Sequence, residues 1–149
     1  MKPATAKPKE IRAMCKFLFV MSAVAAVLTG GFAQAQDAGL AKPVLVLRQL
    51  VDALPREASQ EVRVLTATFK PGDRTVTHSH RFPVTVYVLA GAFTLELKGQ
   101  APVVVKAGEA YVEPPHVEMT GYNRSATDET KVVIFYVSSR DTPFLDPSH

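Results

Sequence analysis

His78 and His80 are the residues of this 149-residue chain whose type and spacing point most directly to chemistry. On a β-strand, side chains at positions i and i+2 project from the same face, about 7 Å apart at the backbone. Two neutral imidazoles placed in this way can hold one divalent metal ion. Two hydrogen-bonded histidines on an edge strand give the same pattern, so the pair alone leaves metal binding open. Ser79 points to the opposite face, which excludes an activated serine nucleophile.

His116 and Glu118 form a second pair with the same spacing. Together with His78 and His80 they would complete a set of three imidazoles and one carboxylate, which suits Zn, Mn, Fe, Ni or Cu. Strand parity opposes the full set, because an inward Met119 turns its neighbour Glu118 outward. We therefore predict a metal site of His78, His80 and His116, with His116 reaching over the mouth of the site from a turn.

Two nearby residues are interpreted as structural. Met119 is expected in a pocket wall, where its thioether would be a ligand only for a soft ion such as Cu(I). Glu113 precedes Pro114 and Pro115 in a rigid turn, and we interpret it as a solvated charge at the rim rather than a catalytic acid. The sequence assigns no catalytic residue.

The elements that must position these residues have the pattern of short β-strands. Runs rich in β-branched residues are separated by Gly, Pro and Asn at intervals typical of turns. The runs cover residues 61–69, 75–80, 84–90, 93–98, 103–106, 110–113, 117–122 and 132–137. Seven or more short strands at this spacing predict an all-β sandwich or barrel. Residues 44–54 are compatible with either a strand or a short helix.

Two glycine-anchored stretches carry a resemblance to a known family. Their residues are Gly72, His78, His80 and Gly91 in the first stretch, and Gly108, Pro114 and Asn123 in the second. In this order and spacing, residues 61–137 resemble the small single-domain members of the cupin superfamily. The resemblance implies an all-β, antiparallel jelly-roll barrel with a pocket between its sheets. It also implies that His78 and His80 are the first two metal ligands.

The chain departs from the family pattern at two ligand positions. Val84 stands where the family's first motif places a glutamate, and Met119 stands where its second motif places a histidine. His116 occupies the position of a turn glycine. With two of four ligands replaced, the resemblance implies weak or incomplete metal binding.

Residues 1–35 contain the segments of a secretory signal peptide in their usual order. Five basic residues precede the apolar run Phe17–Leu28, and the small-residue site Ala33-Gln34-Ala35 follows it. A bilayer needs about 20 apolar residues, so we expect no stable membrane anchor after cleavage. Cys15 would leave with the signal, and a chain from Gln36 without thiols suits a periplasmic or secreted protein. Met14 is an alternative start.

Cleavage would also change the charge, because five of the 17 basic and one of the 14 acidic residues lie in residues 1–35. The remaining charges nearly balance and are scattered, which argues against a nucleic-acid partner. We expect four parts: the signal peptide at 1–35, a linker with a strand or helix at 36–60, the barrel at 61–138 and an extended tail at 139–149. We also predict a homodimer through the apolar residues 44–47.

These features favour an exported small cupin that binds a small-molecule ligand in its pocket. The alternative is a metal-dependent enzyme, either a dioxygenase or an isomerase acting on a small organic acid or phenolic compound. A third possibility is a structural or interaction role, with the pocket filled by Val84, Val86 and Met119. The loss of two family ligands favours binding over catalysis, and a fold alone does not supply a function.

Overall fold

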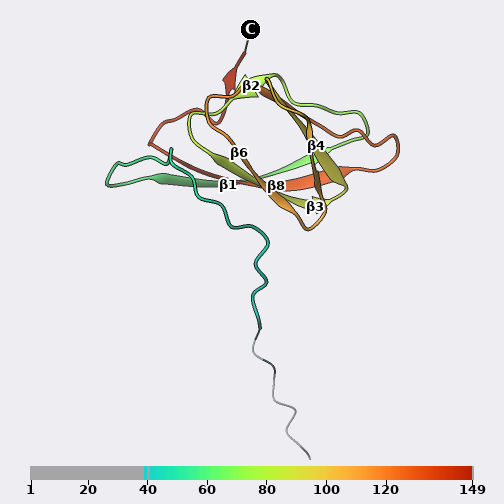
Figure 1. The fold of residues 1–149 in the computed structure, drawn as a ribbon, viewed down its shortest axis with the longest axis horizontal. Coiled ribbons are helices and arrows are strands. Elements are labelled where there is room, and N and C mark those ends of the chain that lie inside the picture. The colour runs from blue at the N-terminus through green and yellow to red at the C-terminus, as the bar shows by residue number, and fades with distance from the viewer. Residues whose placement is uncertain (1–38, 40, 149) are drawn as a thin grey trace, which may run out of the picture. The chain divides into compact units, whose positions relative to one another are not determined.

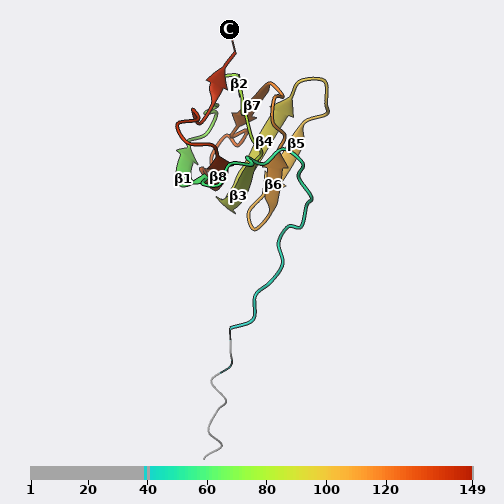
Figure 2. The ribbon, with the colours of Figure 1, turned by 90° about the vertical axis from the view of Figure 1, so that its left-hand side faces the viewer.

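Antiparallel β-strands build the part of the chain that this computed structural model describes, which is residue 39 and residues 41–148. One sheet has the strand order β1-β8-β3-β6, and the other has the order β5-β4-β7-β2-β9. Figures 1 and 2 show how the strands are arranged in space. The strands are β1 (Glu61–Phe69), β2 (His78–Ser79), β3 (Val84–Ala90), β4 (Ala92–Leu97), β5 (Val103–Lys106), β6 (Ala110–Glu113), β7 (Met119–Tyr122), β8 (Thr130–Ser138) and β9 (Asp146–Pro147). The expectation of an all-β, antiparallel fold is confirmed.

The predicted signal peptide lies outside the described residues. Within the described part, the structure contains no helix of the length and apolarity needed to cross a membrane.

Alternating side chains of the two sheets make the core. In β3, Val84, Val86 and Val88 are at most 2% exposed, whereas Leu89 is 55% exposed. This alternation follows from the two-residue repeat of a strand, which turns every second side chain toward the facing sheet. The other buried apolar residues of the core are Phe93, Leu95, Leu97, Val105, Met119, Val132 and Tyr136.

Residues 41–60 form neither the strand nor the helix expected for residues 44–54. Val44, Leu45 and Leu50 are 75% to 92% exposed. A short apolar run needs a neighbouring strand edge to become a strand, and no strand of the described chain pairs with residues 44–54.

The predicted strand at residues 75–80 is reduced to the two residues of β2. The Thr75 hydroxyl accepts the backbone N–H of Gly121 at 2.9 Å, and the Thr75 N–H donates to the Gly121 carbonyl at 2.9 Å. A side chain thus replaces part of the ladder beside β7. On its other edge, β2 pairs with β9, which forms within the expected C-terminal tail.

Candidate functional site

His78, on β2, and His80, directly after β2, point into the barrel. Their side chains are buried, at 5% and 1% exposure, and their ring centroids lie 4.8 Å apart. The two Nε2 atoms approach to 3.2 Å. The pair therefore shares one face, as the spacing on a strand predicts.

Backbone carbonyl groups hold the opposite nitrogen of each ring. His78 Nδ1 donates to the carbonyl oxygen of Val76 at 2.8 Å, and His80 Nδ1 donates to that of Phe144 at 2.7 Å. Because a carbonyl oxygen carries no hydrogen, both Nδ1 atoms must be the protonated ones. In two neutral rings, both Nε2 lone pairs would then face each other. That contact needs a proton or a metal cation between the two atoms.

Glu113 completes the polar cluster. Its carboxylate oxygen Oε2 lies 3.1 Å from His80 Nε2, and the residue is 4% exposed. Our interpretation of Glu113 as a solvated rim charge was therefore wrong. Glu113 is the direct cross-strand partner of Val84 in the β3–β6 ladder. The carboxylate that Val84 cannot provide thus comes from the adjacent strand, on the same inward face.

Burial affects the protonation of His78 in the protein without metal. It lowers the pKa of His78, because a buried imidazolium loses its hydration. The lowered pKa keeps the His78 lone pair available.

The structure does not bring His116 into this cluster. The residue is exposed and has a φ of 59°, in the left-handed region that the family's turn glycine adopts freely. Only its backbone takes part, because its N–H donates to the His80 carbonyl oxygen at 2.8 Å. Glu118 faces away and forms an ion pair with Lys98.

Met119 lies on the inner face of β7. It is 1% exposed, belongs to the hydrophobic core and pairs directly with His78 across the two strands. Met119 is therefore apolar packing, as expected, but it is not among the residues that line the cavity beside the histidines.

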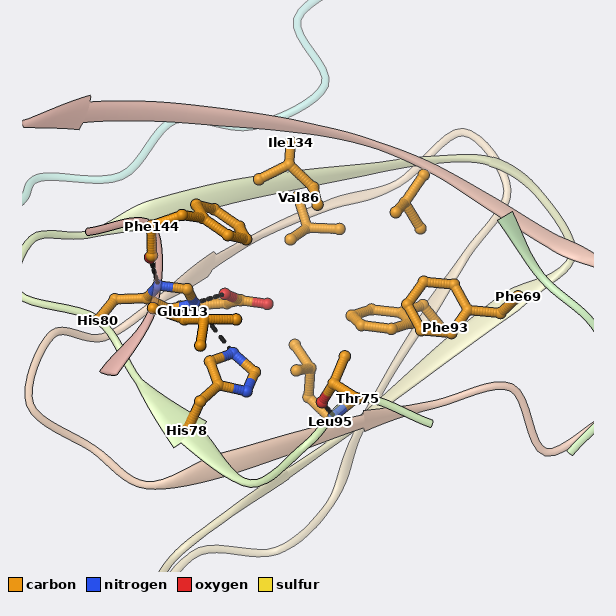
Figure 3. A pocket seen from close by; sticks show the side chains of 13 residues that line it. Phe69, Thr75, His78, His80, Val86, Phe93, Leu95, Glu113, Ile134 and Phe144 are labelled. Atoms are coloured by element: carbon orange, nitrogen blue, oxygen red, sulfur yellow. Dashed lines mark hydrogen bonds and ion pairs between the residues drawn. The ribbon is translucent and has the colours of Figure 1, made fainter. Parts of the chain in front are cut away.

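A cavity of about 60 Å³ extends from the polar cluster into the barrel. Figure 3 shows His78, His80, Glu113 and Phe144 at one end, and Phe69 and Phe93 at the other. The remaining lining residues are Thr75, Val86, Leu95, Gly121, Val132, Ile134 and Leu145. Gly121 makes room for the Phe93 ring, which a Cβ atom at this position would strike. The cavity is therefore apolar except at its histidine end and at Thr75.

The distance between the Nε2 atoms of His78 and His80 is suitable for binding one metal ion. The complete cluster, which includes Glu113, fits a metal ion less well. Two ligand atoms at about 2.1 Å from one ion lie about 3.0 to 3.4 Å apart, which matches the 3.2 Å between the Nε2 atoms. Glu113 contacts His80 and makes no ion pair with His78, so the three groups form a chain rather than a ring. Within residues 41–148, no three His, Cys, Asp or Glu side chains form a ready-made metal site. A third ligand therefore requires the Glu113 carboxylate to turn.

Comparisons with known proteins agree with this architecture. The cupin domain family matches residues 65–136. A double-stranded β-helix protein from Klebsiella pneumoniae is 18% identical, with a TM-score of 0.50 over 69% of this chain and 92% of that chain. A structure from a study of DMSP lyases is 16% identical, with a TM-score of 0.50, and the match covers 59% of this chain and 44% of that chain.

An RmlC-like cupin from Shewanella frigidimarina is 23% identical over 54% of this chain and 69% of that chain, with a TM-score of 0.47. No curated protein sequence matches the chain. At these identities, the two structures with a TM-score of 0.50 support the fold alone.

Proposed function

We propose that this chain, a member of the cupin family by its domain at residues 65–136, is an exported protein that binds a small ligand beside a weakly held divalent metal ion. The observation that carries the proposal is the orientation of the two imidazoles. Backbone carbonyl groups hold both Nδ1 atoms, so the Nε2 atoms of His78 and His80 meet 3.2 Å apart.

His78, His80 and Glu113 are the residues that would hold the ion. Carbonyl acceptors on the far nitrogen are the usual support of metal-bound histidine, because they fix the tautomer and the ring orientation. Two imidazoles and one carboxylate suit Zn, Mn, Fe, Ni or Cu and leave positions for a ligand. Such an ion would supply a Lewis acid that attracts an anionic or phenolic oxygen.

The cavity walls narrow the class of ligand. Apart from the cluster, the lining carries one hydroxyl group, that of Thr75, and no Lys or Arg side chain within the described chain. A sugar or a dicarboxylate would leave several polar groups unpaired against apolar walls. The cavity therefore favours an apolar molecule with a single oxygen-bearing end, such as a small monocarboxylate or a phenol.

The decisive experiment is a calorimetric titration of the chelator-treated protein with Zn²⁺ and Mn²⁺. We expect one site, and we expect His80→Ala to abolish binding while His116→Ala leaves the affinity unchanged. His116 is the matched control because its side chain is exposed and outside the cluster. The proposal fails if the wild-type protein binds neither ion, or if both variants lose binding equally. Circular dichroism of His80→Ala separates loss of binding from loss of folding.

One observation favours a second candidate, a metal-dependent dioxygenase or isomerase. Glu113 restores a carboxylate beside the two histidines, and two His with one carboxylate is the ligand set of non-haem iron oxygenases. Oxygen uptake by the Fe²⁺-loaded protein in the presence of small organic acids and phenols tests the dioxygenase. Chromatography of the same mixtures for isomeric products tests the isomerase.

Export and dimerisation are separate parts of the proposal. Residues 1–35 have the composition of a signal peptide, so mass spectrometry of the protein from cells should find an N-terminus at or near Gln36. Recovery of the intact chain with Cys15 would contradict export. The exposed Val44, Leu45 and Leu50 support a homodimer, and a monomeric mass at micromolar concentration would contradict it.

A further inference from the structure

The C-terminal segment 142–148 lies over the histidine end of the cavity. Phe144 and Leu145 line that cavity, and Phe144 packs its ring 5.2 Å from the ring of His80 and 5.8 Å from that of Tyr136. The Phe144 carbonyl oxygen is the acceptor for His80 Nδ1 at 2.7 Å. One segment, 64 residues away in sequence, thus both closes the cavity and orients a histidine of the cluster.

Thr142 anchors the start of this segment, because its carbonyl oxygen accepts a hydrogen bond from Arg63 Nη2 at 2.9 Å, but few backbone hydrogen bonds attach the residues that follow. β9 pairs only through Asp146 and Pro147, opposite Ser79 and His78, and is the outermost strand of its sheet. The Ser148 N–H donates to the Thr77 carbonyl oxygen at 3.0 Å. Short edge strands are among the first elements to open in a folded domain.

An ion pair with two hydrogen bonds fastens the same segment on its outer side. Arg81 Nε and Nη2 donate to the two carboxylate oxygens of Asp146 at 2.9 and 3.0 Å. Both side chains are more than one third exposed, so solvent screens this attraction. The ion pair between Arg81 and Asp146 therefore has a specific geometry but contributes only modestly to the attachment of the segment.

Three other walls of the cavity belong to strands that are paired along both edges and cannot open so readily. Val86, Ile134 and Leu95 belong to β3, β8 and β4, each of which has a neighbouring strand on both sides. The cavity volume of about 60 Å³ corresponds to roughly four water molecules, which is less than a phenol or a branched acid needs. A ligand of that size must displace Phe144 and Leu145.

We infer that residues 142–148 are a strap that must leave β2 to admit the ligand, and that the Phe144 carbonyl group positions His80 for metal binding when the strap closes. The inference rests on the proposed function for the metal and for the class of ligand. Closure of the strap therefore couples ligand binding to metal binding, because the strap that covers the ligand also restores the orientation of the His80 ring.

A reversible cross-link tests the strap within one protein. Ser79 and Asp146 are direct partners in an antiparallel pair, where Cα atoms lie about 4.5 to 5.5 Å apart, within the range of a disulfide. Ser79→Cys with Asp146→Cys, in a chain carrying Cys15→Ser, locks the strap when oxidised and frees it when reduced. The two states have the same sequence, so each is the control for the other.

The first measurement needs no metal. Phenol is added to the metal-free protein, and NMR follows the methyl groups of Val86 and Ile134. We expect phenol to enter the reduced protein and to enter the oxidised protein at least about tenfold more slowly. Equal rates, or no binding to the reduced protein, would overturn the inference.

The second measurement follows removal of Mn²⁺ by a chelator, since thiolates bind this ion poorly. Removal should be at least about tenfold slower from the oxidised protein. If neither state binds Mn²⁺ or Zn²⁺, the proposed metal function fails while the phenol measurement still decides the strap.

A milder change extends the test. Asp146→Asn breaks the fastening to Arg81 and should speed phenol entry several-fold, whereas Glu96→Gln breaks the exposed ion pair with Arg124 and should not. Equal effects of the two variants would contradict a fastening role for Asp146.

Discussion

Residues 78–80 and residues 116–118 have the same arrangement of a histidine followed two positions later by a second potential metal ligand. In the first, His78 and His80 are buried and in contact with each other. In the second, His116 is exposed and Glu118 pairs with Lys98. The same two-residue spacing therefore leads to different chemistry when the backbone conformation differs.

The backbone differs because of the neighbours of each segment. β2 lies between β7 and β9, and the pairing holds its alternation of inward and outward side chains. His116 follows Pro114 and Pro115 in a turn and has a positive φ, so strand parity does not apply there. The predictions below test this contrast, beginning with the largest effect.

Replacing Glu113 with Ala should destabilise the metal-free protein by about 3 kcal/mol, because losing one partner of the buried His80–Glu113 contact leaves the other buried polar group unpaired. Glu118→Ala should have little effect, because the ion pair of Glu118 with Lys98 is solvated. Urea denaturation of both variants measures the difference. Equal free energies of unfolding would show that the buried contact of Glu113 with His80 does not stabilise the fold.

Exchanging Val84 and Glu113 tests whether the carboxylate can act from either strand, because the two residues are direct cross-strand partners. Glu113→Val alone should lower metal affinity at least about tenfold. Adding Val84→Glu should recover most of that loss, because the carboxylate returns to the same face of the neighbouring strand. Calorimetry measures both affinities, and no recovery in a folded double variant would contradict the shared location.

Stability should fall as the pH drops below about 6.5. The unfolded chain binds a proton at His78 near pH 6.5, whereas burial lowers the pKa of the folded residue. Between these two pKa values the unfolded state binds more protons, so acidification favours unfolding. His78→Gln should reduce this pH dependence and His116→Gln should retain it. Denaturation midpoints between pH 7.5 and 5 provide the measurement, and identical slopes in the two variants would argue against a buried neutral His78.

The smallest expected effect belongs to His116→Gly. Glycine adopts a φ of 59° without the steric cost of a Cβ atom, so the free energy of unfolding should rise by about 0.5 to 1 kcal/mol. Metal affinity should stay unchanged. A thermal melt and a metal titration test both expectations, and lost affinity would return His116 to the ligand set.

Much of the fold could be predicted from local pattern. Val84, Val86 and Val88 alternate with less buried neighbours, and a two-residue repeat is a property of the strand itself. The shared face of His78 and His80 follows from the same repeat. The inward position of Val84 on β3 could also have indicated that Glu113 points inward. That inference required knowing that Val84 and Glu113 are paired across β3 and β6.

Local sequence pattern was sufficient to predict the type of fold, the location of most strands and the placement of two imidazoles on one face. These properties depend on residues that are close along the chain. The tertiary structure determined which residue is the third polar member of the histidine cluster and which segment covers the cavity. Glu113 reaches the cluster through the β3–β6 register, and the Phe144 carbonyl group reaches His80 from 64 residues away. Such contacts depend on which strands become neighbours, and local spacing carries no information about that choice.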